Sequence, residues 1–311
     1  MLALLMPGQG AQTPGMMAPW LDSQIKSGGE QENRKSLANW SLHIDLDLER
    51  LGTSASADEI KDTANAQPLI VATSLLGAKS LNLSKFAAVA GHSVGELTAL
   101  AISGILSPSQ ALELVRQRGL AMAKAASQSE TGMAAVLGGE RIEVLKSIED
   151  FGLVPANDNG AGQIVAAGAL DALDKLNANP PTGARVRALA VAGAFHTSYM
   201  KPAVEHVSKY ASNLEIKDPT AQLLSNKDGA VVNRGKDAIN RIVDQIANPV
   251  RWDLCMESLV QLGVTGAIEL PPAGTLVGLL KRATPSIETF ALKTPEDLPA
   301  ALEFAKKHGG E

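Results

Sequence analysis

The segment from Gly91 to Gly95 reads Gly-His-Ser-Val-Gly and fits the pattern G-x-S-x-G. In this pattern small residues allow a sharp turn between a strand and a helix, and the turn holds a serine hydroxyl above the sheet. An apolar run at 86–90 precedes the segment, and Leu97 and Leu100 follow it at helical spacing. This context favours a serine nucleophile for acyl transfer over an incidental serine in a glycine-rich turn.

A serine hydroxyl needs an adjacent base, most often histidine, and the chain has five histidines. His92 is next to Ser93 in the turn, where consecutive side chains diverge, so we expect it to line the pocket instead of taking the proton. Three others lie in polar or charged stretches and are expected at the surface: His43, His206 and His308. Elimination leaves His196, which follows an apolar run of small residues, as the base. The alternative is a hydrogen-bonded core histidine.

The oxyanion that forms when Ser93 attacks a carbonyl needs N–H donors. The main-chain N–H of the residue after the nucleophile, Val94, is the usual first donor. The glycines in Gly8-Gln9-Gly10 allow close approach of the backbone, so the N–H of Gln9 is the candidate second donor. A plain glycine-rich turn is the alternative for this segment.

Arg118 is an unusual cation because it shares one helix face with three apolar residues, Ala111, Val115 and Met122, at spacing i, i+4, i+7 and i+11. One interpretation is an arginine whose stem packs on apolar groups while its head reaches solvent. The other is a guanidinium that binds a substrate carboxylate through two parallel N–H bonds.

The elements that must position these residues follow from the apolar runs and the residues that end them. Runs bounded by Gly, Pro or polar turns predict strands at 2–6, 86–90, 222–225, 267–270 and 289–292. Helical spacing and caps predict helices at 31–46, from Asp58, after the turn at Ser93, at 108–126 with Ser107 as N-cap, and at 238–246, 254–262 and 275–282. Such alternation is typical of an α/β protein.

Shorter elements fill the middle of the chain. They are predicted as a strand at 133–137, a helix at 141–150, strands at 153–156 and 164–167, a helix at 169–176 and a strand at 185–191. The order βαββαβ is that of a ferredoxin-like unit, here with its central hairpin turning through 157–162. We therefore expect a small ferredoxin-like subdomain at 129–191, inserted into a large α/β subdomain made of 1–128 and 192–311.

Composition limits the possible partners and the location. Lys and Arg total 28 against 33 Asp and Glu, a net charge of −5, which argues against broad electrostatic binding to nucleic acid or to an anionic membrane. No run approaches the roughly 20 apolar residues of a membrane span. The single cysteine, Cys255, cannot form an internal disulfide and is expected to be buried. We expect a cytoplasmic protein without a metal site.

Five segments together resemble malonyl-CoA:acyl carrier protein transacylases. They are Pro-Gly-Gln-Gly-Ala-Gln at 7–12, Gly-His-Ser-Val-Gly-Glu at 91–96, Arg118-Gly119, Phe195-His196 and Asn-Pro-Val-Arg-Trp at 248–252. The resemblance spans nearly the whole chain and implies an α/β-hydrolase-like large subdomain, with a parallel sheet, plus a ferredoxin-like insert. One departure is Pro-Pro-Ala-Gly at 271–274, where the family usually has a Gly-Pro-Gly type of turn, so the geometry of this loop is not implied.

Carried over by position, the resemblance implies a role for each site residue: Ser93 as nucleophile, His196 as base, Gln9 and Val94 as oxyanion donors, and Arg118 as partner of the malonyl carboxylate. It also implies that the main-chain carbonyl of Gln245 orients His196, since no acidic third member stands out. Phe195 resembles the malonyl-selective members, with simple packing as the alternative.

The implied activity is a two-step transfer of malonyl from malonyl-CoA to Ser93, and then to the phosphopantetheine thiol of acyl carrier protein, for fatty acid synthesis. The enzyme itself would need no cofactor, because the partner carries the phosphopantetheine. An acidic carrier would dock on a basic patch, for which the candidates are Lys281-Arg282, Arg185 with Arg187, and Lys201. The motifs leave open a serine esterase or thioesterase, or the transacylase of a polyketide or malonate decarboxylase system.

Overall fold

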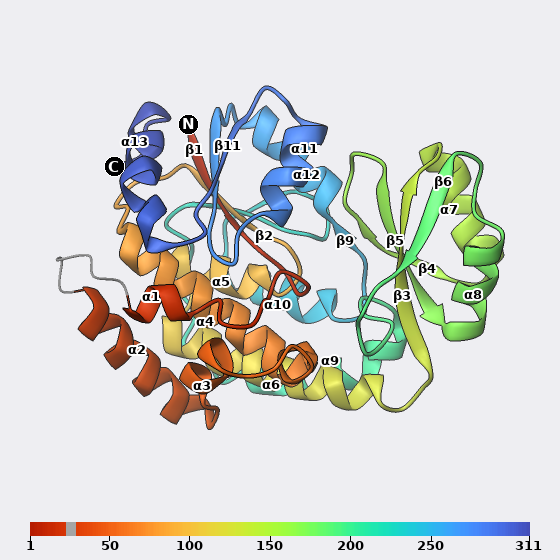
Figure 1. The fold of residues 1–311 in the computed structure, drawn as a ribbon, viewed down its shortest axis with the longest axis horizontal. Helices are drawn as coiled ribbons and strands as arrows, with labels where there is room; N and C mark the ends of the chain where they lie inside the picture. Colours follow the sequence, from red (N-terminus) through yellow and green to blue (C-terminus); the bar gives the residue numbers. More distant parts are fainter. Residues whose placement is uncertain (23–28) are drawn as a thin grey trace.

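Two β-sheets, each with helices packed against it, form the protein (Figure 1). The computed structural model describes residues 1–22 and 29–311. Strands and helices alternate along most of the chain, so the predicted α/β class is confirmed. None of the described helices is long and apolar enough to cross a membrane.

The large sheet has six strands in the order β11-β10-β1-β2-β7-β8. They are β1 Leu2–Met6, β2 Ala88–Gly91, β7 Gln222–Leu224, β8 Val231–Val232, β10 Gly266–Glu269 and β11 Glu288–Ala291. The first five strands in this order run parallel, and β8 pairs antiparallel with β7. Met6 is paired with Gly91, so β1 and β2 end side by side. The loops that follow them, which contain Gln9 and Ser93, therefore leave the same edge of the sheet.

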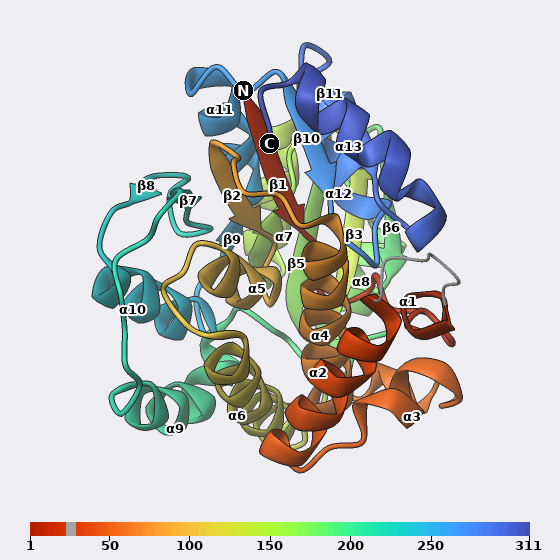
Figure 2. The same cartoon turned by 90° about the vertical axis from the view of Figure 1, so that its left-hand side faces the viewer.

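Helices cover both faces of the large sheet. Leu2, Leu4 and Met6 of β1 contribute to one core cluster and the alternate residues Ala3 and Leu5 to another, as the period of two of a strand requires. On the first face, the core cluster also contains residues of α2 Gly29–Ile44, α4 Thr63–Leu81, α5 Gly95–Ile102, α6 Pro108–Ala126, α9 Lys201–Ala211, α10 Gly235–Gln245 and α13 Leu298–Lys307. Of these, α2, α6 and α9 pack mainly on other helices. The second face is covered by α11 Trp252–Gln261 and α12 Thr275–Ala283. Figure 2 shows α4 and α5 below β1 and β2.

The small sheet has the order β6-β3-β5-β4-β9. Its strands are β3 Thr131–Gly138, β4 Val154–Asp158, β5 Gln163–Ala169, β6 Ala184–Ala188 and β9 Val250–Arg251, and its helices are α7 Arg141–Asp150 and α8 Leu170–Ala178. Elements β3 to β6 follow the predicted βαββαβ order. The predicted hairpin turn is shorter than expected because Asn157 and Asp158 still belong to β4. The subdomain limits at 128/129 and 191/192 stay predictions.

A shared core joins the two sheets. Val165 and Ala167 of β5 belong to the same apolar cluster as the helices of the large sheet, whereas Ile164 and Ala166 pack with α7 and α8. The parallel strand β9 beside β4 comes from the returning large part of the chain and was not predicted. The small sheet is therefore held on one face and at one edge by the rest of the molecule.

The last helix corrects one expectation from the sequence. His308 was expected in a solvated, charged tail, but it follows α13 and is only 6% exposed. Its ring lies 4.5 Å from that of Phe304, and its Nδ1 is 2.9 Å from Oγ1 of Thr265. The buried face of α13 consists of the small residues Ala301 and Ala305, which give a weak signal next to the charged residues of the same segment. Helix α13 was not predicted from the sequence, and neither were the two short helices α1 Ala18–Asp22 and α3 Leu48–Thr53.

Candidate active site

The turn between β2 and α5 places Ser93 at the edge of the large sheet. Ser93 has a positive φ of 51°, in the left-handed region that non-glycine residues rarely adopt. The two glycines of the motif make this turn possible. A Cβ at Gly91 would lie 2.1 Å from the carbonyl carbon of Gly95, and a Cβ at Gly95 would lie 2.2 Å from the main-chain oxygen of Met6.

His196 lies directly against the nucleophile. Its Nε2 is 2.7 Å from Oγ of Ser93, and its Nδ1 is 2.8 Å from the main-chain oxygen of Gln245. Because a carbonyl oxygen only accepts hydrogen bonds, Nδ1 is the donor and Nε2 is free to accept the Ser93 proton. The loop that carries His196 is anchored where Ala194 N–H donates to Thr131 Oγ1 at 3.1 Å. The structure thus brings together Ser93, His196 and Gln245, the three residues that the resemblance had grouped.

The imidazole of His196 is in an environment that disfavours a positive charge. Its side chain is buried, with 3% of the residue exposed. Burial and the positive charge of Arg118 lower the pKa of His196 to about 3, and the hydrogen bond to Gln245 opposes this change. His196 is therefore neutral at physiological pH, and its Nε2 is free to accept a proton.

Arg118 is completely buried next to Ser93, so the interpretation that its head reaches solvent is wrong. Its Nη1 donates to Oε1 of Gln67 at 2.7 Å, and its Nη2 donates to Oε1 of Gln245 at 2.9 Å. Nη2 also lies 3.5 Å from Oγ of Ser93. Burial lowers the pKa of Arg118 to about 10, which still leaves the guanidinium charged at neutral pH. A buried cation therefore lies within hydrogen-bond distance of the nucleophile.

The candidate oxyanion donors lie on the two neighbouring loops. A Cβ at Gly8 would be 2.8 Å from the main-chain oxygen of His92, so the loop after β1 packs closely on the turn that holds Ser93. Among the residues that the structure describes, the N–H groups of Gln9 and Val94 have no hydrogen-bond acceptor. Both remain available to a reacting carbonyl oxygen.

A cavity of about 440 Å³ opens beside the turn. Its walls come from both parts of the molecule: the loop at 8–12, His92, Asn157, Asn159, Gln163, Val165, the segment 189–191, and Thr275, Leu276 and Leu279. His92 is one of these lining residues, and its Nε2 is 2.8 Å from Oδ1 of Asn159. Phe195 is 5% exposed and belongs to the main apolar core.

The divergent loop at 271–274 lies next to this cavity. Both oxygens of the buried Glu269 carboxylate accept main-chain N–H bonds from Gly274, Leu276 and Val277 at 2.9–3.0 Å. Ser74 also donates to the main-chain oxygen of Pro271 at 2.5 Å. The loop is therefore well anchored despite its departure from the usual turn.

Three polar residues of the site had not been identified from the sequence: Gln67, Glu96 and Asn226. All three are at least 97% buried. Asn226 accepts the N–H of Ser93 through Oδ1 at 2.7 Å and donates to the main-chain oxygen of Gly91 at 2.8 Å. The available signal was a polar residue next to an apolar run, since Gln67 directly precedes Pro-Leu-Ile-Val-Ala at 68–72 of α4.

The basic residues suggested for carrier docking are all on the surface. Lys281, Arg282, Arg185, Arg187 and Lys201 are exposed, and none of them takes part in an ion pair within residues 1–22 and 29–311. They lie on three elements: α12 carries Lys281 and Arg282, β6 carries Arg185 and Arg187, and α9 carries Lys201.

Comparison with known proteins agrees with this geometry. The acyl transferase domain family matches residues 4–298. The malonyl CoA-acyl carrier protein transacylase of Mycobacterium tuberculosis is 52% identical over 303 residues, which cover 96% of this chain and 98% of that protein. The crystal structure of MCAT from Mycobacterium tuberculosis is 50% identical, with a TM-score of 0.91 and coverage of 97% and 99%. A type II PKS acyl-carrier protein in complex with its malonyl-transacylase contains a chain that is 27% identical, with a TM-score of 0.88 and coverage of 97% and 99%. The chain belongs to the acyl transferase family, among the malonyl CoA-acyl carrier protein transacylases.

Proposed function

We propose that this protein transfers a malonyl group from malonyl-CoA to the phosphopantetheine thiol of an acyl carrier protein, through a malonyl ester on Ser93. One observation carries the proposal. The Ser93 hydroxyl is within hydrogen-bond distance both of a neutral base, His196, and of a buried cation, Arg118. The base suits acyl transfer, and the cation suits an acyl group that ends in a carboxylate.

The first half-reaction begins with proton transfer. As Oγ of Ser93 forms its bond to the thioester carbon, its proton passes to Nε2 of His196. The N–H groups of Val94 and Gln9 donate to the oxyanion. The carbon–sulfur bond then breaks, and the proton on His196 goes to the CoA sulfur. A thiol has a pKa near 8.5, so this leaving group needs only modest help from an acid.

The second half-reaction reverses these roles. His196 takes the proton of the carrier's phosphopantetheine thiol, the sulfur attacks the malonyl ester, and the proton returns to Oγ of Ser93. The main-chain carbonyl of Gln245 keeps the His196 ring in one tautomer through both steps. No cofactor of the enzyme itself is required, and the 440 Å³ cavity beside His92 is our candidate for the pantetheine channel.

Arg118 distinguishes this proposal from an esterase. Placing an anion in a buried site is costly unless a cation meets it, and a cation is equally costly there without a partner. A neutral ester would leave the guanidinium without a role, whereas a malonyl carboxylate gives it one. Phe195 we assign to the packed wall beside His196, where it favours malonyl over bulkier branched acyl groups.

Pathway, location and docking belong to the same proposal. We assign the malonyl product to fatty acid synthesis in the cytoplasm, which fits a chain whose single cysteine is free and buried. The complex of a type II PKS carrier with its malonyl-transacylase supports a polyketide carrier as the second candidate partner. The exposed Lys281-Arg282 pair on α12 is our first choice of docking surface, because α12 also contributes to the cavity wall.

Mass spectrometry of the intact protein after brief exposure to malonyl-CoA tests the proposal. We expect one malonyl adduct, which disappears when holo acyl carrier protein is added and which is absent from the Ser93→Ala variant. A folded Ser93→Ala protein that still forms the adduct would exclude Ser93 as the nucleophile. Hydrolysis of malonyl-CoA without an adduct or transfer would instead indicate an esterase.

A further inference from the structure

Gln245 connects the base to the cation. Its main-chain oxygen accepts from His196, and its side-chain Oε1 accepts from Nη2 of Arg118 at 2.9 Å. A guanidinium has donors only, so the amide must turn its oxygen toward Arg118 and its NH₂ group away from it. The Nε2 of Gln245 then donates to Oε2 of Glu96 and, at 3.1 Å, to Oδ1 of Asn226.

Glu96 is the acceptor at the other end of this chain of hydrogen bonds. It lies in the first turn of α5, three residues after the nucleophile, and is 3% exposed. Its Oε1 accepts the main-chain N–H of Asn226 at 2.8 Å, and its Oε2 accepts from Gln245. Both oxygens face N–H donors, which is the pattern of an ionised carboxylate. A glutamine of the same shape would place its NH₂ group against one of these two donors.

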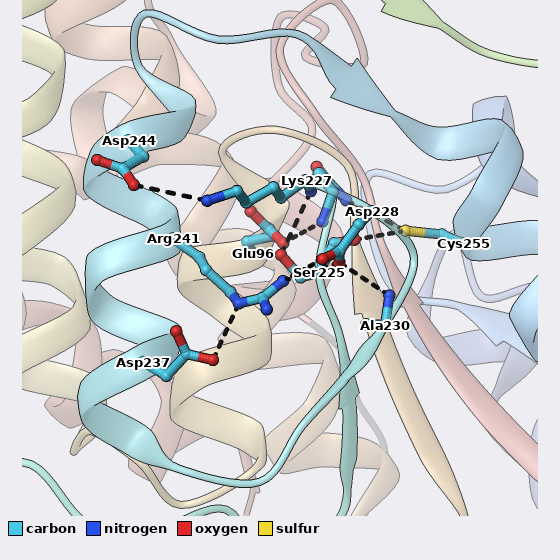
Figure 3. A network of polar contacts seen from close by, with 10 residues as sticks. Glu96, Ser225, Lys227, Asp228, Ala230, Asp237, Arg241, Asp244 and Cys255 are labelled. Atoms are coloured by element: carbon cyan, nitrogen blue, oxygen red, sulfur yellow. Dashed lines mark hydrogen bonds and ion pairs between the residues drawn. The ribbon is translucent and has the colours of Figure 1, made fainter.

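The charged groups around Glu96 also connect it with Arg118. Figure 3 shows Arg241 of α10 near Glu96, but Arg241 already forms ion pairs with Asp228 and Asp237 at 2.8 and 3.0 Å. Arg118 forms no direct ion pair with any carboxylate in the described part of the chain. Burial raises the pKa of Glu96 to about 8, and the N–H of Asn226 and the charge of Arg118 oppose this rise. Above this raised pKa, the Glu96 carboxylate and the Arg118 cation therefore balance each other through the amide of Gln245.

We propose that Glu96 is a positioning residue for malonyl selection: its carboxylate fixes the orientation of the Gln245 amide and thereby holds Arg118 where the malonyl carboxylate binds. This inference rests on the proposed function of the site. Glu96 itself does not touch Oγ of Ser93, and its effect on the reaction passes through Gln245. Acetyl-CoA has no carboxylate to bind, so its reaction depends far less on this arrangement.

The test is the Glu96→Gln variant, measured at pH 8.5 so that Glu96 of the unmodified protein is ionised. We would determine kcat/KM for acylation of Ser93 by malonyl-CoA and by acetyl-CoA. For malonyl-CoA we expect a loss of about ten- to a hundredfold, the value of a charge-assisted hydrogen bond. For acetyl-CoA we expect a change of less than about threefold. The ratio of kcat/KM for malonyl-CoA to kcat/KM for acetyl-CoA in Glu96→Gln should fall toward the ratio found for Arg118→Ala.

Two matched variants control for damage to the fold. Thr98→Val lies on the same helix and removes a buried hydroxyl that has no hydrogen-bond partner among the described residues, so both reactions should be unchanged. Glu269→Gln alters another buried carboxylate that accepts only main-chain N–H bonds outside this network, so both reactions should change together. Equal losses for malonyl-CoA and acetyl-CoA in folded Glu96→Gln would overturn the inference, as would an unchanged malonyl reaction.

Gln245→Met tests the same connection from the other end and decides the matter if Glu96→Gln does not fold. This variant keeps the main-chain oxygen that holds His196 but removes the amide. We expect the same selective loss for malonyl-CoA, and the Glu96→Gln/Gln245→Met double variant should lose no more than either single variant. An unchanged preference in Gln245→Met would refute the inference. If the unmodified protein formed no malonyl adduct at all, the proposed function would fail instead.

Discussion

In the proposed mechanism, both half-reactions depend on one property of a single residue, the neutrality of His196. The imidazole must accept a proton from Ser93 and later from a thiol, and it can do so only when it is uncharged. Burial and Arg118 both lower the pKa of His196, to about 3. Arg118, the proposed partner of the malonyl carboxylate, therefore also helps to keep the His196 imidazole neutral.

This arrangement predicts the pH dependence of acylation. Between pH 5 and pH 7 the rate of adduct formation on Ser93 should be nearly constant, because His196 stays neutral well below the usual histidine pKa of about 6.5. Stopped acylation reactions with acetyl-CoA, analysed by intact mass, would measure it. In Arg118→Ala the rate of acylation should begin to fall at a higher pH, because the charge of Arg118 no longer lowers the pKa of His196. A fall in the acylation rate of the unmodified protein with a midpoint near pH 6.5 would contradict the prediction.

The sequence could identify residues whose signal is local, and it could not identify those defined by packing. Ser93 lies in a recognisable motif, and Arg118 stands out on an apolar helix face. Glu96 also lies in the motif region, but its role depends on Asn226 and Gln245, which are 130 and 149 residues away along the chain. Such contacts exist only once β7 and α10 have packed beside α5.

Helix α6 illustrates the same distinction at the scale of elements. Its observed bounds, Pro108–Ala126, match the prediction because Ser107 and Gln110 form a capping box with proline at the first position. Strand β9, in contrast, has two residues and exists only because β4 lies beside it. Local caps can therefore be found in a sequence, whereas a short strand depends on its neighbour.

The cap of α6 leads to a prediction that separates stability from substrate choice. Ser107→Ala removes the side chain that accepts the N–H of Gln110 and should lower the free energy of unfolding by about 1 kcal/mol. Arg118 lies three turns further along the helix, so the preference for malonyl over acetyl should not change. Urea denaturation and acylation assays would measure the two effects. Ser127→Ala, at the exposed C-terminal end of α6, is the matched control and should change stability by less than about 0.5 kcal/mol. A changed substrate preference in Ser107→Ala would show that the cap influences the position of Arg118.

At the scale of the whole molecule, the site needs both sheets. The large sheet supplies Ser93, and His196 lies on the segment that returns from the small sheet. Asn159, which follows β4 of the small sheet, contacts His92 of the turn at the nucleophile. The position of the small sheet relative to the large one therefore helps to shape the cavity.

A cluster of charges lies where the two parts of the molecule meet. Arg141 of α7 donates to Oδ2 of Asp158 through Nε at 2.9 Å and Nη2 at 2.7 Å, and Asp158 is 4% exposed. The same Nη2 lies 4.0 Å from the carboxylate of Asp253 in α11, which in turn accepts from Arg251 of β9. Arg141 thus contacts carboxylates of both parts.

Removal of Arg141 should therefore destabilise the protein more than removal of a neighbouring exposed charge. In Arg141→Ala, the buried Asp158 keeps only the N–H of Gly160 at 3.1 Å, which should lower the free energy of unfolding by about 1–3 kcal/mol. Lys146→Ala on the same helix is the matched control, because its pair with Asp150 is exposed and should contribute less than about 0.5 kcal/mol. Urea denaturation followed by circular dichroism would compare the two variants. Equal losses would mean that the Arg141 pair acts as an ordinary surface ion pair, and that the apolar core shared by β5 and the large subdomain holds the two sheets together without it.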